Sequence, residues 1–265
     1  MAVPPVPSVP PAPSVVARLR AAGCVFAEEE AELLLSAART PEELGTMVER
    51  RAAGHPLEHV VGWAEFRGLR VTVGEGVFVP RRRTEFLVER AEALARRGGT
   101  VVVDLCCGSG ALGAALVTAL DGAELYAADI DPAAVRCARR NVAPVGGQVY
   151  EGDLYGPLPA GLRGRVDVLL ANVPYVPTGE VELLPAEARD HEARVALDGG
   201  ADGLDVLRRV TGEATAWLAP GGSLLFETSE RQAPTATAIV AAAGLTPHVA
   251  TCEDRYATVV IGTHD

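Results

Sequence analysis

The sequence predicts an α/β protein in which a parallel sheet is covered by helices. Over residues 100–262, short apolar strand patterns alternate with helical patterns, which is typical of a parallel sheet with helices on both faces. A glycine-rich turn follows the first of these strands. Helical patterns and one hairpin-like segment precede residue 100. With 265 residues, 48% of them hydrophobic, the chain can bury one large core and a small additional one.

The N-terminal part predicts a short tail and a small helical module. Residues 1–13 contain six prolines, which exclude a helix or a central strand and favour a disordered or polyproline-like tail. Ser14 is a candidate N-cap for a helix that ends at Ala22. Two further helices are expected over 27–39 and 42–53, so we place a helical module at 14–56.

A β-hairpin is expected to link this module to the sheet domain, over residues 57–83. The segment 59–80 is rich in valine and aromatic residues and carries a glycine turn near Gly68. A helix is predicted over 84–97, and the main domain then covers 84–265. Its strands are expected near 100–105, 123–129, 147–151, 166–172, 222–228, 246–251 and 256–262.

Polar residues end three of the predicted strands. Asp104, Asp129 and Asn172 follow apolar runs, and ligands of parallel sheets bind at the carboxyl ends of strands. All three side chains are therefore expected in one crevice. Asn172 is one of only two asparagines, in a chain whose 24 basic residues are all arginine. This composition indicates a coding bias against asparagine, so its retention at 172 favours a chemical role.

The glycine turn permits more than one ligand. Gly108, Gly110 and Gly113 spell G-x-G-x-x-G, with Asp129 about 20 residues on, as in dinucleotide sites. Any adenosine cofactor, or a tight turn without ligand, fits the same pattern. Asp104 favours a cofactor other than a dinucleotide, because a carboxylate at this position repels a pyrophosphate and attracts an ammonium group. S-adenosylmethionine carries such a group.

Composition excludes several classes of protein. The net charge of -11 argues against a broad nucleic-acid surface. No apolar run approaches the roughly 20 residues that span a bilayer, and no signal peptide is recognisable, so we expect no membrane partner and a cytoplasmic protein. The five cysteines form no zinc pattern, and we expect reduced thiols and no metal.

The segment "NVPY", residues 172–175, resembles the Asn/Asp-Pro-Pro-aromatic motif of class I methyltransferases that act on planar nitrogens. The surrounding chain resembles the HemK/PrmC family of protein glutamine N5-methyltransferases over about 55–262. The matching stretches are "HPLEHVVG", "FVPRRRTEFLVE", "VVVDLCCGSGALGAAL", "AADIDPAAVRCARRN", "EGDLY", "ANVPY", "ALDGGADGL" and "GGSLLFE".

The resemblance implies a Rossmann-like class I fold with a seven-stranded, mostly parallel sheet. It also implies S-adenosylmethionine as cofactor, S-adenosylhomocysteine as product, and a peptide-chain release factor with a Gly-Gly-Gln loop as protein substrate. Direct contact with nucleic acid is not expected. The helical module at 14–56 is then expected to recognise the substrate.

The resemblance also assigns roles to residues. Asn172 and Tyr175 are the expected catalytic residues: the Asn172 oxygen and the carbonyl of Val173 accept the two amide hydrogens, while the Tyr175 ring stacks on the amide. The expected substrate contacts are Asn172, Val173, Pro174, Tyr175 and Glu192. The expected cofactor residues are Asp104, Cys106, Cys107, Gly108, Ser109, Gly110, Asp129, Asp153, Leu154 and Asn172. Within this set Asp129 faces the ribose, and Asp153 and Leu154 lie near the adenine. Asp153 is alternatively a solvated turn residue, and Glu192 a surface carboxylate.

Three departures from the family pattern bear on these roles. Val173 replaces a proline, which leaves Pro174 and Pro177 to hold the turn. Cys106 stands where the family has glycine and narrows the cofactor pocket. Arg82 replaces a proline in "PRRRTE", residues 80–85. Arg81, Thr84 and Glu85 are expected either to pack around the cofactor mouth or to form a charged helix start.

Other readings of the sequence remain open at this point. The same motif grips the exocyclic amine of a flipped base in nucleobase methyltransferases. The glycine pattern alone also fits a nicotinamide-dependent oxidoreductase, and the changes at Val173 and Cys106 are compatible with a non-catalytic relative that binds S-adenosylmethionine.

Overall fold

The computed structural model describes residues 12–96 and 98–265. Most of the tail predicted for 1–13 lies outside these residues. Its last two residues were assigned wrongly, because helix α1 (Ala12–Ala21) already includes Ala12 and Pro13. A proline is tolerated there because the amide hydrogens of a first helical turn have no intrahelical partner. Ser14 therefore lies inside the helix and not at its N-cap.

The N-terminal module consists of α1, α2 (Ala27–Ala37), α3 (Pro41–Ala52) and α4 (Leu57–Val61). The predicted helices at 27–39 and 42–53 are confirmed to within two residues. Thr40 caps α3 by accepting a hydrogen bond from the Glu43 backbone N–H. Buried side chains from all four helices form one core, among them Leu19, Leu34, Leu44 and Val60.

The hairpin linker is shorter than predicted. Residues 57–61 form α4, which ends where Gly62 adopts a φ of +83°. The strands β1 (Trp63–Phe66) and β2 (Leu69–Thr72) pair antiparallel around Gly68, as expected. The strand-like stretch "GVFVP", residues 76–80, does not form a strand; only Gly76 forms an isolated bridge, with Glu192.

The main domain contains a seven-stranded sheet in the order β5-β4-β3-β6-β7-β9-β8. Its strands are β3 (Val101–Leu105), β4 (Glu124–Asp129), β5 (Gln148–Glu151), β6 (Val166–Ala171), β7 (Leu218–Thr228), β8 (Thr246–Cys252) and β9 (Ala257–Thr263). Only β9 runs antiparallel to its neighbours. This confirms the predicted mostly parallel sheet. β7 begins four residues earlier than expected, through a register shift opposite Val166 and Val168.

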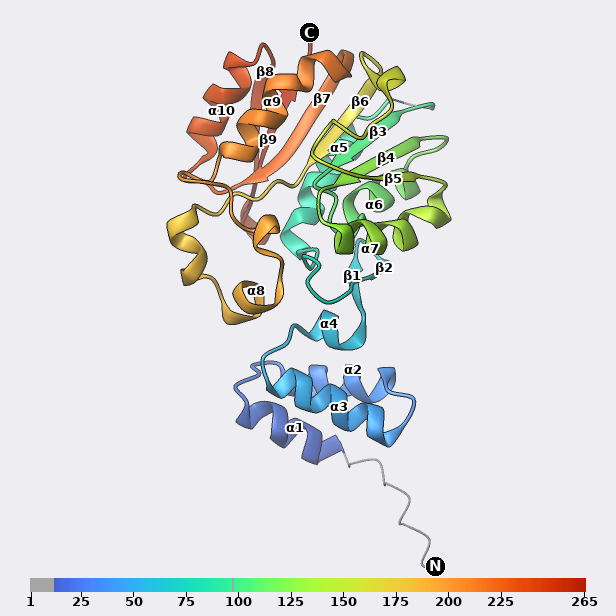
Figure 1. Cartoon of the computed structure of the whole chain (residues 1–265), viewed down its shortest axis with the longest axis vertical. Coiled ribbons are helices and arrows are strands. Elements are labelled where there is room, and N and C mark those ends of the chain that lie inside the picture. The colour runs from blue at the N-terminus through green and yellow to red at the C-terminus, as the bar shows by residue number, and fades with distance from the viewer. Residues whose placement is uncertain (1–11, 97) are drawn as a thin grey trace, which may run out of the picture.

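Helices cover both faces of this sheet (Figure 1). The buried core of one face includes side chains of α9 (Asp205–Trp217) and α10 (Ala233–Ala242). The other includes side chains of α5 (Glu85–Leu94) and α6 (Ala111–Ala119). The α7 helix (Pro132–Val142) packs against β4 and β5. Alternate residues of β6 enter opposite cores, because successive strand side chains point to opposite faces. None of the helices in the described part of the chain has the length and apolarity needed to cross a membrane.

One buried arginine joins the N-terminal module to the main domain. Arg51 of α3 forms hydrogen bonds of 2.6 and 3.0 Å to Glu30 of α2. Its remaining terminal nitrogen lies 2.7 Å from Glu187, in α8 (Ala186–His191) of the main domain. The rings of His55 and His191 also meet across this boundary, with centroids 4.2 Å apart. Figure 1 shows the module and α8 on the same side of the sheet domain.

This arrangement predicts a large loss of stability for Arg51→Met. The substitution keeps much of the volume but leaves the Glu30 carboxylate buried without its partner, which costs about 3 kcal/mol of unfolding free energy. Arg20→Ala is the matched control, because Arg20 pairs with Glu28 in the same module and both side chains are more than half exposed. It should cost less than about 1 kcal/mol. Urea unfolding measures both, and equal losses would contradict the assigned role of Arg51.

Candidate active site

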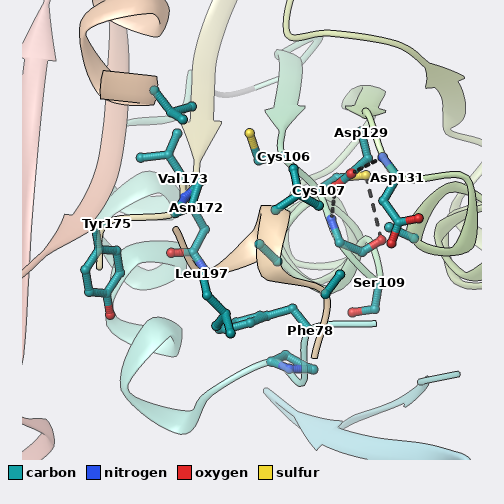
Figure 2. Close-up of a pocket in the computed structure, with 18 of the residues that line it drawn as sticks. Phe78, Cys106, Cys107, Ser109, Asp129, Asp131, Asn172, Val173, Tyr175 and Leu197 are labelled. Carbon is teal, nitrogen blue, oxygen red and sulfur yellow. Dashed lines mark hydrogen bonds between the residues drawn. The ribbon is translucent and has the colours of Figure 1, made fainter. Parts of the chain in front are cut away.

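A cavity of about 480 Å³ lies at the carboxyl ends of β3, β4 and β6. This is where the predicted crevice was placed. Asp104, Asp129 and Asn172 all line it. Figure 2 shows Asn172 and Tyr175 on one side of the cavity and Ser109 and Asp129 on the other. The three strand ends therefore meet in space as the sequence predicted.

The three glycines of the loop after β3 serve two different purposes. Gly108 has a φ of +55°, and a Cβ added there would meet no atom within 4 Å. The space beside it is open to a ligand. In contrast, a Cβ at Gly110 would lie 2.8 Å from Val142, and one at Gly113 would lie 2.7 Å from Leu125. These two glycines permit close packing of α6 on its neighbours.

Asp104 presents an unpaired oxygen at the cavity. Its side chain is buried, and Oδ2 accepts a hydrogen bond of 2.9 Å from the Gly113 backbone N–H. Oδ1 has no hydrogen-bond partner among the described residues. Burial raises the pKa of this carboxyl to about 7, and the nearby Asp129 charge contributes to the rise. A cationic group would satisfy Oδ1 and favour its ionised form.

Asp129 holds the glycine loop while it faces the cavity. Its Oδ2 accepts a hydrogen bond of 2.8 Å from Gly108, and Oδ1 accepts one of 2.9 Å from Asp131. Each oxygen retains a lone pair that can accept a hydroxyl. Asp153 and Leu154, which were expected near the adenine, also line the cavity. Asp153 is half-exposed and forms an ion pair with the exposed Arg209, in addition to lining the cavity.

Cys106 and Cys107 follow Asp104 in different environments. Cys106 lines the cavity with a φ of +52°, a conformation in which most side chains are strained. Glycine would adopt this conformation without a clash of a Cβ atom. Cys107 is buried, and its backbone N–H donates to the Ala128 carbonyl over 3.1 Å. Burial raises the pKa of both thiols, so neither is a ready nucleophile.

The "NVPY" segment leaves the sheet directly after β6. The strand ends at Ala171, one residue earlier than predicted. Asn172 then lines the cavity, and its side-chain oxygen is buried without a hydrogen-bond partner among the described residues. The Val173 side chain packs into the main core, and no described residue donates a hydrogen bond to its carbonyl. Two acceptors at adjacent positions are thus available to a ligand.

Contacts from the segment 197–203 and from α10 hold this turn, in addition to its prolines. A Cβ at Gly199 would lie 2.6 Å from the Pro174 carbonyl oxygen, and one at Gly203 would lie 2.3 Å from that of Tyr175. Only glycine permits such close approach of the two backbones. The Gln232 side chain also donates to the Tyr175 carbonyl over 2.9 Å. The backbone freedom that Val173 adds is therefore limited by tertiary packing.

The hydroxyl of Tyr175 has both a hydrogen-bond acceptor and a hydrogen-bond donor as partners. It donates a hydrogen bond of 2.9 Å to Glu227 and accepts one of 2.7 Å from Arg83. Burial, with the adjacent Glu227 charge, raises the pKa of Tyr175 to about 12, so the phenol is neutral. Sequence reasoning assigned no role to Glu227 or Arg83. The quoted stretches "GGSLLFE" and "PRRRTE" contain them, but only the fold brings them together.

Glu192 lies behind the cavity wall. Its side chain is completely buried, and both oxygens accept hydrogen bonds from Arg81, at 2.6 and 2.7 Å. It is therefore not a surface carboxylate, and it is not among the residues that line the cavity. Arg81 does line it. Thr84 donates to Glu227, and Glu85, the first residue of α5, accepts from the Arg67 backbone; neither is among the residues that line the cavity.

Asn141, the second asparagine, has a structural role. Its amide nitrogen donates to the carbonyls of Thr72 and Ser109, each over 2.8 Å, and its oxygen accepts from the Thr72 backbone N–H. The hairpin, α7 and the glycine loop are thereby connected by one side chain. The composition indicated that an asparagine is needed. It did not show whether that asparagine contacts a ligand or, like Asn141, joins parts of the fold.

The sequence is similar to those of known methyltransferases. Residues 69–210 match the family model "Methyltransferase small domain". A release factor glutamine methyltransferase of Deinococcus radiodurans is 39% identical over 247 residues, covering 86% of this chain and 88% of that protein. A 4-amino-L-phenylalanine/4-methylamino-L-phenylalanine methyltransferase of Streptomyces pristinaespiralis is 36% identical, covering 91% and 85%.

Among solved structures, a methyltransferase from Pyrococcus furiosus is similar in fold. Its TM-score is 0.56 at 17% sequence identity, and the match covers 74% of this chain and 89% of that one. This identity supports the fold alone. The sheet order, the family model and the relatives agree on a class I methyltransferase, which excludes the oxidoreductase reading of the glycine loop. The chain belongs to the HemK/PrmC family of class I methyltransferases.

Proposed function

We propose that this protein methylates the side-chain amide nitrogen of a glutamine in a peptide-chain release factor, with S-adenosylmethionine as donor. The observation that carries the proposal is the buried, unpartnered oxygen of Asn172 at the cavity wall, next to the free carbonyl of Val173. A primary amide has two N–H groups, which match two adjacent acceptors. Relatives named release factor glutamine methyltransferases, at 34–42% identity, support the acceptor.

The residues of the cavity fit S-adenosylmethionine. Asp104 offers an unpaired oxygen to its ammonium, and Asp129 retains lone pairs for ribose hydroxyls. The space beside Gly108 allows close backbone approach, while Asp153 and Leu154 lie where the adenine is expected. When bound, the cofactor supplies a methyl group activated by a positively charged sulfur. Cys106, Cys107 and Ser109 complete the proposed cofactor wall, whereas Gly110, also expected there, is not among the lining residues and packs against Val142.

The chain's own contribution to the reaction is to orient the amide and to favour charge on its nitrogen. An amide nitrogen is a weak nucleophile because its lone pair is delocalised. Asn172 and the Val173 carbonyl would accept its two hydrogens and stabilise the positive charge that develops during transfer. The Tyr175 ring and Pro174 would confine the amide plane, and correct positioning supplies much of the barrier reduction. The methylated nitrogen then loses one of its two original hydrogens as a proton to solvent, so no general base has to deprotonate the amide before the transfer.

The remaining partner assignments follow from the proposed acceptor. We assign recognition of the protein substrate to the N-terminal module, which touches α8 at the cavity through Arg51 and Glu187. Release factors act in the cytoplasm, so that compartment remains the expected one. Glu192 would act on the substrate only through Arg81, because it lies behind the wall.

A small aromatic amine is the second candidate acceptor. The relative from Streptomyces pristinaespiralis is named for such substrates and aligns with nearly the whole chain. Beyond Asn172 the cavity is lined by apolar side chains that would accommodate an aromatic ring: Phe78, Leu184, Pro185, Val195 and Leu197. Parallel assays with 4-aminophenylalanine and with a release factor separate the two candidates by which one accepts the methyl group.

The proposed function predicts methylated glutamine in a release factor from the host. Incubation with radiolabelled S-adenosylmethionine should place one methyl group on that residue, located by tandem mass spectrometry. Asn172→Ala should lower kcat at least about a hundredfold, because one of two preorganised acceptors is lost. Glu180→Gln is the control, since this carboxylate pairs with the exposed Arg231 outside the cavity. Label that never appears on glutamine would refute the proposal.

The pKa of Asp104 predicts how cofactor binding depends on pH. The carboxyl is protonated below about pH 7 in the free protein and must ionise to face an ammonium group. Affinity for S-adenosylmethionine should therefore rise with pH, by up to about tenfold per unit between roughly pH 5.5 and 7. Isothermal titration calorimetry measures the slope. Asp104→Asn should bind more weakly with a flat profile; a slope that survives this change would assign the titration elsewhere.

The strained backbone of Cys106 predicts that Cys106→Gly stabilises the protein. Glycine adopts a φ of +52° without a Cβ clash, which is worth about 1 kcal/mol of unfolding free energy. The same change widens the cavity and should not weaken cofactor binding. Cys107→Gly is the matched control: its φ is not in the left-handed region and its side chain is buried, so it should destabilise. Thermal unfolding with and without cofactor distinguishes the two, and equal destabilisation would exclude strain at Cys106.

A further inference from the structure

Glu227 is a buried carboxylate close to the cavity, and the proposed reaction does not use it directly. Glu227, near the end of β7, is only 3% exposed and does not line the cavity. Its two oxygens nevertheless receive three hydrogen bonds, from Arg83, Thr84 and Tyr175. A buried carboxylate is costly unless it is paired and fully hydrogen-bonded, as this one is.

The three partners come from two parts of the chain that border the cavity. Arg83 Nε lies 2.7 Å from Glu227 Oε1, and Thr84 Oγ1 lies 2.7 Å from Oε2; both residues stand at the start of α5. The Tyr175 hydroxyl donates to Oε1 from the turn that follows Asn172. Arg83 also donates to the Tyr175 oxygen, so the guanidinium, phenol and carboxylate close a triangle.

This triangle fixes the direction of the Tyr175 ring. Its hydroxyl has one donor partner, Arg83, which also lines the cavity, and one acceptor partner, Glu227, which does not, so the position of the oxygen is fixed from two sides. Tyr175 lines the cavity, and its ring lies on the same side of it as Asn172 (Figure 2). A charge-assisted network of this kind restricts rotation of the phenol more than packing alone does. Both hydrogen bonds of the Tyr175 hydroxyl therefore serve to orient the ring, and the hydroxyl is unavailable for proton transfer.

We infer that Glu227 is a positioning residue, which acts on the methyl acceptor by locking the Tyr175 ring through the Arg83–Tyr175–Glu227 triangle. This inference rests on the proposed methylation of a planar nitrogen, because a flat acceptor group gains most from a fixed ring face. Loss of orientation costs rate even when all groups remain present. It leaves the cofactor side unaffected, since Glu227 touches none of the residues assigned to the cofactor.

Kinetics of Glu227→Gln, Tyr175→Phe and the double variant test the inference. Glutamine keeps the volume of Glu227 but loses the charge that holds Arg83, and phenylalanine keeps the ring but loses the hydroxyl. Each single change should lower kcat on the order of tenfold, with affinity for S-adenosylmethionine within about twofold of the parent. The double variant should be no slower than the slower single variant, because both changes break the same triangle.

Multiplied losses in the double variant, or weaker cofactor binding by Glu227→Gln, would overturn the inference in favour of a general structural role. Glu89→Gln is the matched control. This α5 carboxylate also pairs with an arginine, Arg255, but is 42% exposed and distant from the cavity wall. Its kcat should remain within about twofold of the parent.

A crystal structure of Glu227→Gln with S-adenosylmethionine supplies a readout that needs no acceptor. The Tyr175 ring should be displaced from the cavity wall or disordered, and an unchanged, ordered ring would refute the positioning role. If the parent enzyme fails to methylate glutamine, the proposed function fails on its own. The ring in this structure then decides the inference about Glu227.

Discussion

Two buried oxygen atoms of residues at the cavity have no hydrogen-bond partner among the described residues, and the rest of the fold must offset the cost of burying them. Asp104 Oδ1 and Asn172 Oδ1 belong to residues at the ends of adjacent parallel strands, and each lacks a partner in the described part of the chain. An unsatisfied buried acceptor costs about 1–3 kcal/mol. The seven-stranded sheet and its two helical layers provide the stability that offsets this cost. Ligands can recover it by supplying the missing donors, which links folding stability directly to recognition.

The sheet and the position of the cavity could be predicted because local patterns determine them. Strand boundaries were right to within about a residue at β3, β4, β5, β6, β8 and β9, where apolar runs stop at polar or glycine residues. Boundaries failed where tertiary contacts override local signals. Residues 57–61 form α4 although two of them are valine. β7 extends back through a proline and two glycines because Leu218 pairs with Val166 of β6 before the register shift.

The supports of the site could not be predicted, because they join segments far apart in sequence. Arg83 and Glu227 are separated by 144 positions, and Arg81 and Glu192 by 111. No pattern in one sequence indicates which arginine meets which carboxylate. The same holds for Val173, which looks like a weakened motif in isolation. Its turn is held by Gly199, Gly203 and Gln232, so the substitution removes less rigidity than the lost proline suggests.

The contact between Arg51 and Glu187 has a consequence for how such proteins can be recombined. The N-terminal module has its own core, yet the arginine at its edge shares its charge between an internal partner, Glu30, and a carboxylate on a helix that borders the cavity. The N-terminal module therefore cannot be exchanged independently of the main domain. A chimera whose first 62 residues carry no arginine at position 51 leaves Glu187 without this partner, so residue 187 has to be exchanged together with the module.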